Sequence, residues 1–203
     1  MAKSFAYRGA AAALVALITV LGGCAGTPAA GKASPAAGQA PAGTERILPY
    51  THIDGFGTPS DELAWISWEF EALDFVKYQI DYISCTCRPD SINKQSLLYV
   101  EIAKGGTGGK IRKVWFDYWG DSPYMPDGTT REEIETNFMP KLVNTKAADV
   151  EALDTMSGAT VTTVNLKQIL GAVLAYHNDK YAAPGLGEAP DYVDAESGAT
   201  VAD

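Results

Sequence analysis

The clearest chemical signal in the sequence is a run of small and hydroxyl-bearing residues, DTMSGAT, from Asp154 to Thr160. Gly158 and Ala159 have almost no side chain, so the active site of another protein can close on the backbone beside the Thr160 hydroxyl. An amphipathic helix is predicted from Thr163, with Thr162 as its N-cap. A phosphate ester on Thr160 would lie near the helix N-terminus, where N–H groups favour negative charge. We interpret the run as a modification site.

The pattern Asp-x-x-Ser-Gly-Ala-Thr resembles the flavinylation motif of the FMN-binding domain family, which includes the covalently flavinylated subunits of Na+-pumping NADH:quinone reductase and of Rnf complexes. In that family an FMN transferase takes FMN from FAD and joins its phosphate to the hydroxyl of the final threonine. Thr160 matches that threonine, and Asp154 and Ser157 also match. The resemblance covers residues 95 to 181. It implies covalent FMN on Thr160 and a cofactor-binding turn of Asp154, Ser157, Gly158 and Ala159. The alternative is an ordinary turn that leads into a helix.

A second copy of the pattern, from Asp194 to Val201, ends on Thr200 as the matching threonine. An exposed tail is easier for a transferase to reach than a folded loop. We therefore predict a second flavinylation site at Thr200, whose tethered FMN would exchange electrons with the FMN on Thr160. The alternative is a decayed or truncated repeat.

Residues 1–23 form a targeting segment. Lys3 and Arg8 make a basic start, an apolar stretch follows, and Leu21-Gly22-Gly23-Cys24 resembles a bacterial lipoprotein signal in which Cys24 is acylated. A plain secretory signal with an incidental cysteine is the alternative. Residues 24–46 are rich in Ala, Pro and Gly and are predicted to be a flexible tether. We expect an extracytoplasmic protein anchored to the bacterial cell membrane.

Composition limits the choice of partners and of domain number. With 203 residues, of which 46% are hydrophobic, the chain has room for one packed domain plus tails. A net charge of −9 argues against nucleic acid, because a phosphate backbone requires a basic surface. We assign the domain to residues 47–182 and a second flexible tail to residues 183–203.

The predicted fold class is α+β: a small antiparallel sheet with a β-hairpin and packed helices. Thr58 and Pro59 read as a helix start, and the predicted helix runs to Tyr78. Its core face would contain Leu63, Ile66, Phe70 and Leu73, and Trp65, Trp68 and Phe75 would form either a second buried face or an aromatic wall for a flavin ring.

Strands are predicted for residues 79–86, 95–103 and 110–119, the last two forming the hairpin. Thr130 and Glu133 predict a capping box that starts a short helix ending near Met139.

Other reactive residues give weaker signals. Cys85 and Cys87 are predicted to form either a strained, reducible disulfide or a metal-binding dithiol, although two ligands are too few for a structural zinc site. We predict no metal site. His52, expected in a loop, and His177, near a helix end, have no ligand pattern around them, so surface or packing roles are expected. Neither acidic pairs nor histidines suggest a catalytic residue.

The resemblance to the FMN-binding domain family implies an electron-transfer flavoprotein, an electron carrier or a subunit of a redox chain, rather than a stand-alone enzyme. The resemblance implies an FMN transferase for maturation, a membrane electron donor and an extracytoplasmic electron acceptor. Trp115, Tyr118 and Trp119, near the predicted hairpin, are aromatic candidates for contact with the flavin, and the sequence does not give the face on which they lie. Two alternatives stay open: a flavin-dependent reductase of a small extracellular acceptor, and a non-redox lipoprotein that binds a ligand or a partner.

Overall fold

The computed structural model describes residues 46–84, 95–121 and 128–193. In this part of the chain one antiparallel sheet has the strand order β1-β2-β3-β4-β5, so each strand pairs with its neighbours in sequence. The strands are β1 (Ile47–Ile53), β2 (Pro59–Glu71), β3 (Phe75–Ile83), β4 (Gln95–Ala103) and β5 (Lys110–Tyr118). With the helices described below, the sheet confirms the predicted α+β class.

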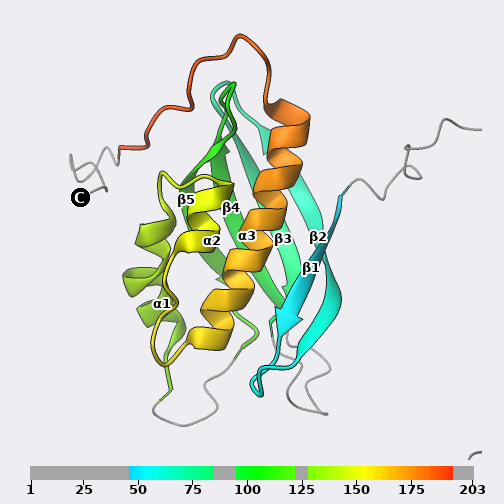
Figure 1. The fold of residues 1–203 in the computed structure, drawn as a ribbon, viewed down its shortest axis with the longest axis vertical. Coiled ribbons are helices and arrows are strands. Elements are labelled where there is room, and N and C mark those ends of the chain that lie inside the picture. The colour runs from blue at the N-terminus through cyan, green and yellow to red at the C-terminus, as the bar shows by residue number, and fades with distance from the viewer. Residues whose placement is uncertain (1–45, 85–94, 122–127, 194–203) are drawn as a thin grey trace, which may run out of the picture. The chain divides into compact units, whose positions relative to one another are not determined.

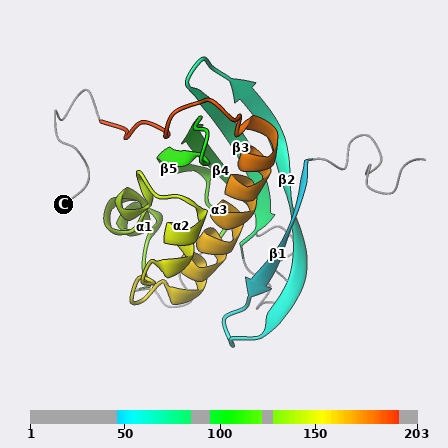
Figure 2. The same cartoon turned by 45° about the horizontal axis from the view of Figure 1, so that its top comes forward.

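The sheet has two unlike faces because its strands alternate with a period of two. In β3 the buried positions are Val76, Tyr78, Ile80 and Tyr82, and in β4 they include Leu98, Val100 and Ile102. These side chains lie on what we call the inner face. Figures 1 and 2 show the helices on one side of the sheet, where they cover this apolar face. The opposite, outer face is not covered by a described helix.

The helix predicted from Thr58 to Tyr78 is wrong, because this region forms β2, a turn and the start of β3. Of the four residues assigned to the helical core face, only Ile66 is buried, whereas Leu63, Phe70 and Leu73 are 62%, 50% and 96% exposed. The register of β2 on β3 shifts between Ile66 and Trp68. A β-bulge inserts one residue and so breaks the period of two. The resulting spacing of apolar residues imitates a helix.

Strand β1 was not predicted, and His52 lies in this strand rather than in a loop. Its pattern is clear in the structure: Leu48, Tyr50 and His52 face inward, while Ile47, Pro49 and Thr51 are exposed. The proline stands at an outward position of an edge strand, where a missing N–H does little harm.

In the residues described after the sheet there are three α-helices and one 3-10 helix: α1 (Arg131–Asn137), η1 (Met139–Leu142), α2 (Ala147–Ala152) and α3 (Thr160–Tyr181). The capping box is confirmed, since Glu133 N donates to Thr130 Oγ1 at 3.2 Å and Thr130 N donates to Glu133 Oε2 at 2.7 Å. Pro140 is compatible with the 3-10 helix η1 because it lies in the first turn, where the missing N–H breaks no hydrogen bond within the helix. No helix in the described residues has the length and hydropathy needed to cross a membrane.

Helix α3 supplies the largest part of the cover on the inner face, and it starts earlier than predicted. It begins at Thr160 with Ala159 at the N-cap position, so Thr162 lies inside the first turn and is not the cap. The predicted apolar stripe is confirmed: the residues that follow are all buried, namely Leu166, Ile169, Leu170, Val173, Leu174 and His177. Contacts of α3 with β1 and α2 fix the helix across the sheet.

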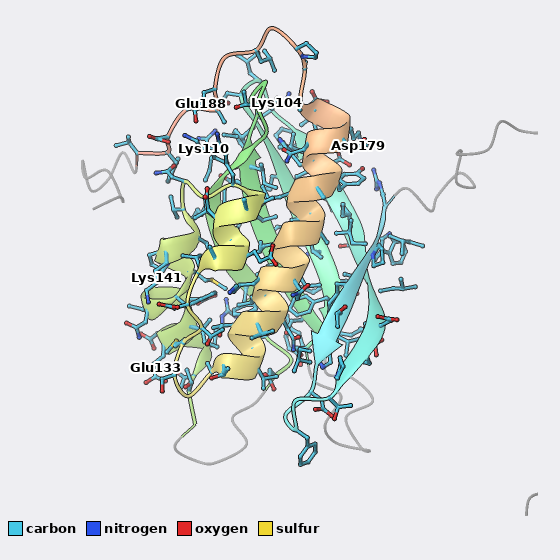
Figure 3. All side chains as sticks on the ribbon, in the orientation of Figure 1. Lys104, Lys110, Glu133, Lys141, Asp179 and Glu188 are labelled. Atoms are coloured by element: carbon cyan, nitrogen blue, oxygen red, sulfur yellow. The ribbon has the colours of Figure 1, made fainter. Side chains whose placement is uncertain are left out.

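Residues 183–193, predicted as the start of a flexible tail, make specific contacts with the domain. Gly106 N donates to Gly187 O at 2.9 Å, and Tyr192 N donates to Asn144 Oδ1 at 2.6 Å. Lys110 pairs with Asp191 at 2.6 Å and with Glu188 at 3.5 Å; Figure 3 shows Lys110 and Glu188 at the same end of the sheet. The domain therefore extends past residue 182 in the part of the chain that the structure describes.

Candidate functional site

Thr160 lies at the surface, at the first position of α3. Its Oγ1 is 3.5 Å from Met156 O, which is the outer limit of a hydrogen bond, so the hydroxyl is not held in the protein interior. Asp154, Ser157 and Gly158 are exposed as well, while Ala159 is only 6% exposed and packs inward. The structure thus presents the motif as an exposed turn between α2 and α3.

Gly158 is required by the shape of this turn. Its φ angle is +83°, a conformation that L side chains rarely adopt. A Cβ at this position would also lie 2.8 Å from Thr129 Oγ1. Behind the glycine, Ala159 N donates to Met156 O at 3.1 Å and closes the turn. The glycine predicted to give access therefore also has a structural role.

Thr163 joins the turn to the helix. Its buried Oγ1 accepts a hydrogen bond from Met156 N at 3.2 Å and donates to Ala159 O at 2.9 Å. The backbone bond from Thr163 N to Ala159 O, 2.9 Å long, is the first of the helix. The N–H groups of residues 160–162 precede it and point out of the helix end. These N–H groups and the dipole of a 22-residue helix create a positive potential beside the Thr160 hydroxyl.

A layer of buried polar side chains lies beneath the first turns of α3. Asn165 binds both backbone groups of Ile53, with Ile53 N donating to Oδ1 at 2.8 Å and Nδ2 donating to Ile53 O at 2.9 Å. Thr162 Oγ1 lies 3.0 Å from Asp121 Oδ2, and Gly120 N donates to Ser96 Oγ at 2.9 Å. These bonds hold the start of α3 against β1 and against the residues that follow β5.

Three side chains of this layer have polar atoms without a well-aligned hydrogen bond to the described residues. They are both ring nitrogens of His52, the hydroxyl of Tyr82 and Nε1 of Trp119, and the contacts of Tyr82 with Ser96 and of His52 with the backbone of Ile83 are weaker interactions. His52 is 0% exposed and Tyr82 is 2% exposed. Burial lowers the pKa of His52 and outweighs the nearby carboxylates of Glu62 and Asp54, so the ring is neutral at neutral pH. Such atoms cost about 1–3 kcal/mol each unless a ligand or water completes them.

We call these residues, His52, Tyr82, Ser96, Trp119, Asp121, Thr162 and Asn165, the polar layer. Sequence reasoning missed most of it, because its members come from β1, β3, β4, the residues that follow β5, and α3. The signal available in the sequence was Ser96, a polar residue at an inward position of β4, whose other inward positions are apolar. Of the aromatic residues predicted near the flavin, only Trp119 belongs to this region.

The other aromatic candidates lie on the outer face. Trp115 stacks on Tyr99, with ring centroids 5.2 Å apart, and Tyr118 is 54% exposed. Trp65 pairs with Asp81 of β3, and Trp68 pairs with Gln79 of β3. The neighbours of these two β3 residues, Ile80 and Tyr78, face inward, so Trp65 and Trp68 face outward. Because α3 covers the inner face, these rings do not form a wall around Thr160. The aromatic wall predicted as one alternative for residues 65, 68 and 75 is therefore wrong for a flavin on this threonine. The other alternative, a second buried face, is wrong as well, because Trp65 and Trp68 are 58% and 42% exposed.

A second polar cluster surrounds the C-terminal end of α3. Glu69 accepts hydrogen bonds from Tyr176 at 3.1 Å, from Lys180 at 2.9 Å and from Tyr181. Burial acts to raise the pKa of Glu69, but the bonds from Tyr181 and Lys180 outweigh it and lower the pKa. His177 shares a 2.9 Å hydrogen bond with Tyr78, and burial lowers its pKa to about 4. The packing role predicted for His177 is thus confirmed.

Other predicted sites are placed elsewhere or lie outside the described residues. Cys24, Cys85, Cys87 and Thr200 belong to the ranges that the structure does not describe. In the described ranges, no group of three or more His, Cys, Asp and Glu side chains is placed to hold a metal ion. A surface hollow between β5, η1 and Tyr192 contains no residue of the motif turn.

No family model, no curated protein and no solved structure matches this chain.

Proposed function

We propose that this chain is a membrane-anchored, extracytoplasmic flavoprotein that transfers electrons through FMN joined to Thr160 by a phosphoester bond. The observation that carries the proposal is the exposed Thr160 hydroxyl at the first position of α3, in a turn that matches the flavinylation motif. When bound, FMN accepts and donates electrons, and the protein determines its position and surroundings.

Attachment would be a phosphoryl-type transfer with FAD as the donor. The Thr160 oxygen would form a bond to the FMN phosphorus, the pyrophosphate bond of FAD would break, AMP would leave and the hydroxyl proton would pass to solvent or to the transferase. The exposed turn supports this step, because the hydroxyl is at the surface and Gly158 adds no side chain beside it. The product phosphate would face the N–H groups of residues 160–162.

The polar layer also fits a flavin beside Thr160. His52, Tyr82 and Trp119 retain buried polar atoms without well-aligned hydrogen bonds. Because these atoms are closed off from the surface, a flavin on Thr160 would complete their hydrogen bonds through water or after a local opening of the layer. Residues such as Asn165 and Thr163 would keep the first turn of α3 in place while the cofactor is attached.

The remaining parts of the proposal concern the anchor and a second flavin. Lipidated Cys24 would hold the domain at the membrane through residues 24–46, within reach of a membrane electron donor and an extracytoplasmic acceptor. Thr200, in the repeated motif, would carry the second FMN. Both residues lie outside the described ranges, so the support for them is the sequence pattern.

The experiment is the intact mass of the protein after co-expression with an FMN transferase. We expect the wild type to gain one FMN at Thr160 and a second at Thr200. The Thr160→Ala protein should lose one, and the Thr160→Ala/Thr200→Ala protein should carry none. Thr155→Ala is the matched control, because Thr155 is exposed in the same turn but is not the matching threonine.

Two results separate the parts of this proposal. A Thr160→Ala protein with the same flavin content as the wild type would refute attachment at Thr160. A Thr160→Ala protein with no flavin would leave Thr160 as the attachment site and remove Thr200 from the account.

A further inference from the structure

Exposed apolar side chains of the described residues concentrate along β2. Seven of the ten large hydrophobic residues with exposed side chains lie between positions 47 and 73. Five of these face outward on β1 and β2, and we call them the β2 stripe: Ile47, Leu63, Trp65, Trp68 and Phe70. The other two, Phe56 and Leu73, lie at the turns before and after β2 and are 81% and 96% exposed.

The strand register places the β2 stripe on the outer face. Ile47 pairs with Trp65, and Trp65 pairs with Asp81 on its other side. Beyond the bulge, the rings of Trp68 and Phe70 stack with centroids 5.9 Å apart and an interplanar angle of 6°. The bulge therefore turns both halves of β2 so that their large apolar residues share one face.

Nothing in the described part of the domain covers this face. Trp65 is 58% exposed and Trp68 is 42% exposed, and α3 lies on the opposite side of the sheet. Contiguous apolar patches of this kind mark surfaces that bind a partner or a membrane. Tryptophan in particular suits a membrane interface, where its ring is buried and its N–H stays hydrated.

The chain enters the domain beside the β2 stripe. Ile66 N donates to Arg46 O at 2.9 Å, so the segment that precedes β1 reaches the sheet next to Trp65. Cys24, the proposed lipid site, stands 22 residues before Arg46. A segment of this length that is flexible, as its composition predicts, would span about 25 Å on average. A lipid anchor on Cys24 would thus keep this edge of the sheet close to the bilayer.

We propose that the β2 stripe docks on the surface of the membrane that carries the anchor, with Trp65 and Trp68 inserted among neutral phospholipid headgroups. This inference rests on the proposed lipidation of Cys24. It does not require flavin attachment.

Charge and tethering favour a bilayer over another occupant. The outward positions of β2 from Leu63 to Phe70 carry no charged residue, whereas an acidic chain of net charge −9 is repelled by anionic lipid. Because the tether holds the domain near the surface, its effective concentration there is high and even weak docking is populated. One acyl anchor plus an apolar patch gives more stable membrane binding than either signal alone.

Docking would give the domain a defined orientation. With the outer face on the bilayer, the layer that contains α3 faces the aqueous phase. The Thr160 turn at the start of α3 would then be presented to soluble partners rather than hidden against lipid.

The test uses the mature chain, residues 24–203, with Cys24→Ser to remove the anchor, and vesicles of phosphatidylcholine. We expect the protein to sediment with the vesicles and its tryptophan fluorescence to shift to the blue. Trp65→Gln/Trp68→Gln should weaken vesicle binding at least about tenfold. Leu63→Gln/Phe70→Gln, the second variant, should weaken it as well. Leu186→Gln is the control, because Leu186 is 48% exposed but lies outside the stripe.

Several outcomes would overturn the proposal. One is a Cys24→Ser chain with an unaltered β2 stripe that does not sediment with neutral vesicles. Another is vesicle binding that both double variants retain while they stay folded. A concentration-dependent dimer that Trp65→Gln/Trp68→Gln disrupts, without any vesicle binding, would assign the stripe to a second copy of the chain. Intact mass reports flavin separately, so these outcomes are distinct from failure of the proposed function.

Discussion

The two ends of α3 are both polar, but their polar groups are satisfied to different degrees. At the C-terminal end, Glu69 accepts hydrogen bonds from Tyr176, Lys180 and Tyr181, which join the helix to β2, and among the described atoms of this cluster only Nε2 of His177 is buried without a well-aligned partner. At the N-terminal end, the helix begins with an exposed threonine, and the polar layer beneath it retains atoms of His52, Tyr82 and Trp119 without well-aligned hydrogen bonds to the described residues. A paired cluster stabilises a fold, whereas unpaired groups beside an exposed hydroxyl are suited to a ligand.

The largest effect on stability is expected at the C-terminal end. Glu69→Ala should lower the free energy of unfolding by about 3–4 kcal/mol, because it removes a buried carboxylate and leaves the half-buried hydroxyls of Tyr176 and Tyr181 without this acceptor. Flavin attachment should be unchanged, because Thr160 lies at the other end of the helix. Urea unfolding and intact mass of the same variant check both statements. A Glu69→Ala protein that is as stable as the wild type but carries no flavin would contradict the stabilising role given to the C-terminal end of α3.

The second largest effect is expected from acid, which should lower the stability of the fold through His177 at the same end of α3. Burial lowers the pKa of His177 from 6.5 to about 4, so the unfolded state binds a proton more readily than the folded state. Stability should therefore fall as the pH drops from 6.5 to about 4, by about 3 kcal/mol for this group, and the contribution is complete at neutral pH. His52, whose pKa burial also lowers, adds to the loss.

The measurement is urea unfolding at a series of pH values for the wild type and for His177→Gln, which keeps a polar side chain near Tyr78. The variant should show a smaller loss of stability between pH 6.5 and 4. Equal slopes for the two proteins would show that His177 does not control the acid response.

A smaller effect is expected at the N-terminal end from Gly158→Ala. The positive φ angle and the close approach to Thr129 should cost about 2 kcal/mol, and the distorted turn should slow flavin attachment. Gly171→Ala is the matched control: Gly171 lies within α3, and an added Cβ meets nothing within 4 Å, so this change should stabilise the helix slightly. Thermal unfolding and the rate of FMN incorporation compare the two. Similar behaviour of both variants would contradict the role given to Gly158.

The sequence predicts those parts of the fold that depend on local patterns. The capping box of Thr130 and Glu133 and the buried stripe of α3 are confirmed because neighbouring residues determine them. Strand β2 was mistaken for a helix because a bulge shifts its alternation, and only the pairing with β3 reveals that shift. Local reasoning cannot detect a feature that a neighbouring strand defines.

The candidate site shows the same division. The motif turn is contiguous in sequence, so its residues could be named without a structure. The polar layer depends on contacts such as that of Ile53 with Asn165, which are 112 residues apart. Contacts of this range arise only when α3 crosses the sheet. The sequence could therefore identify the attachment residue but not the groups beneath it.

The measurement that tests the central claim most directly is fragmentation mass spectrometry of the tryptic peptide 147–167, which contains the whole motif turn between Lys146 and Lys167. After exposure of the wild type to active FMN transferase, we expect this peptide to carry FMN and the fragments to place it on Thr160. The same peptide without flavin, or with flavin on Thr155 or Ser157, would contradict the account.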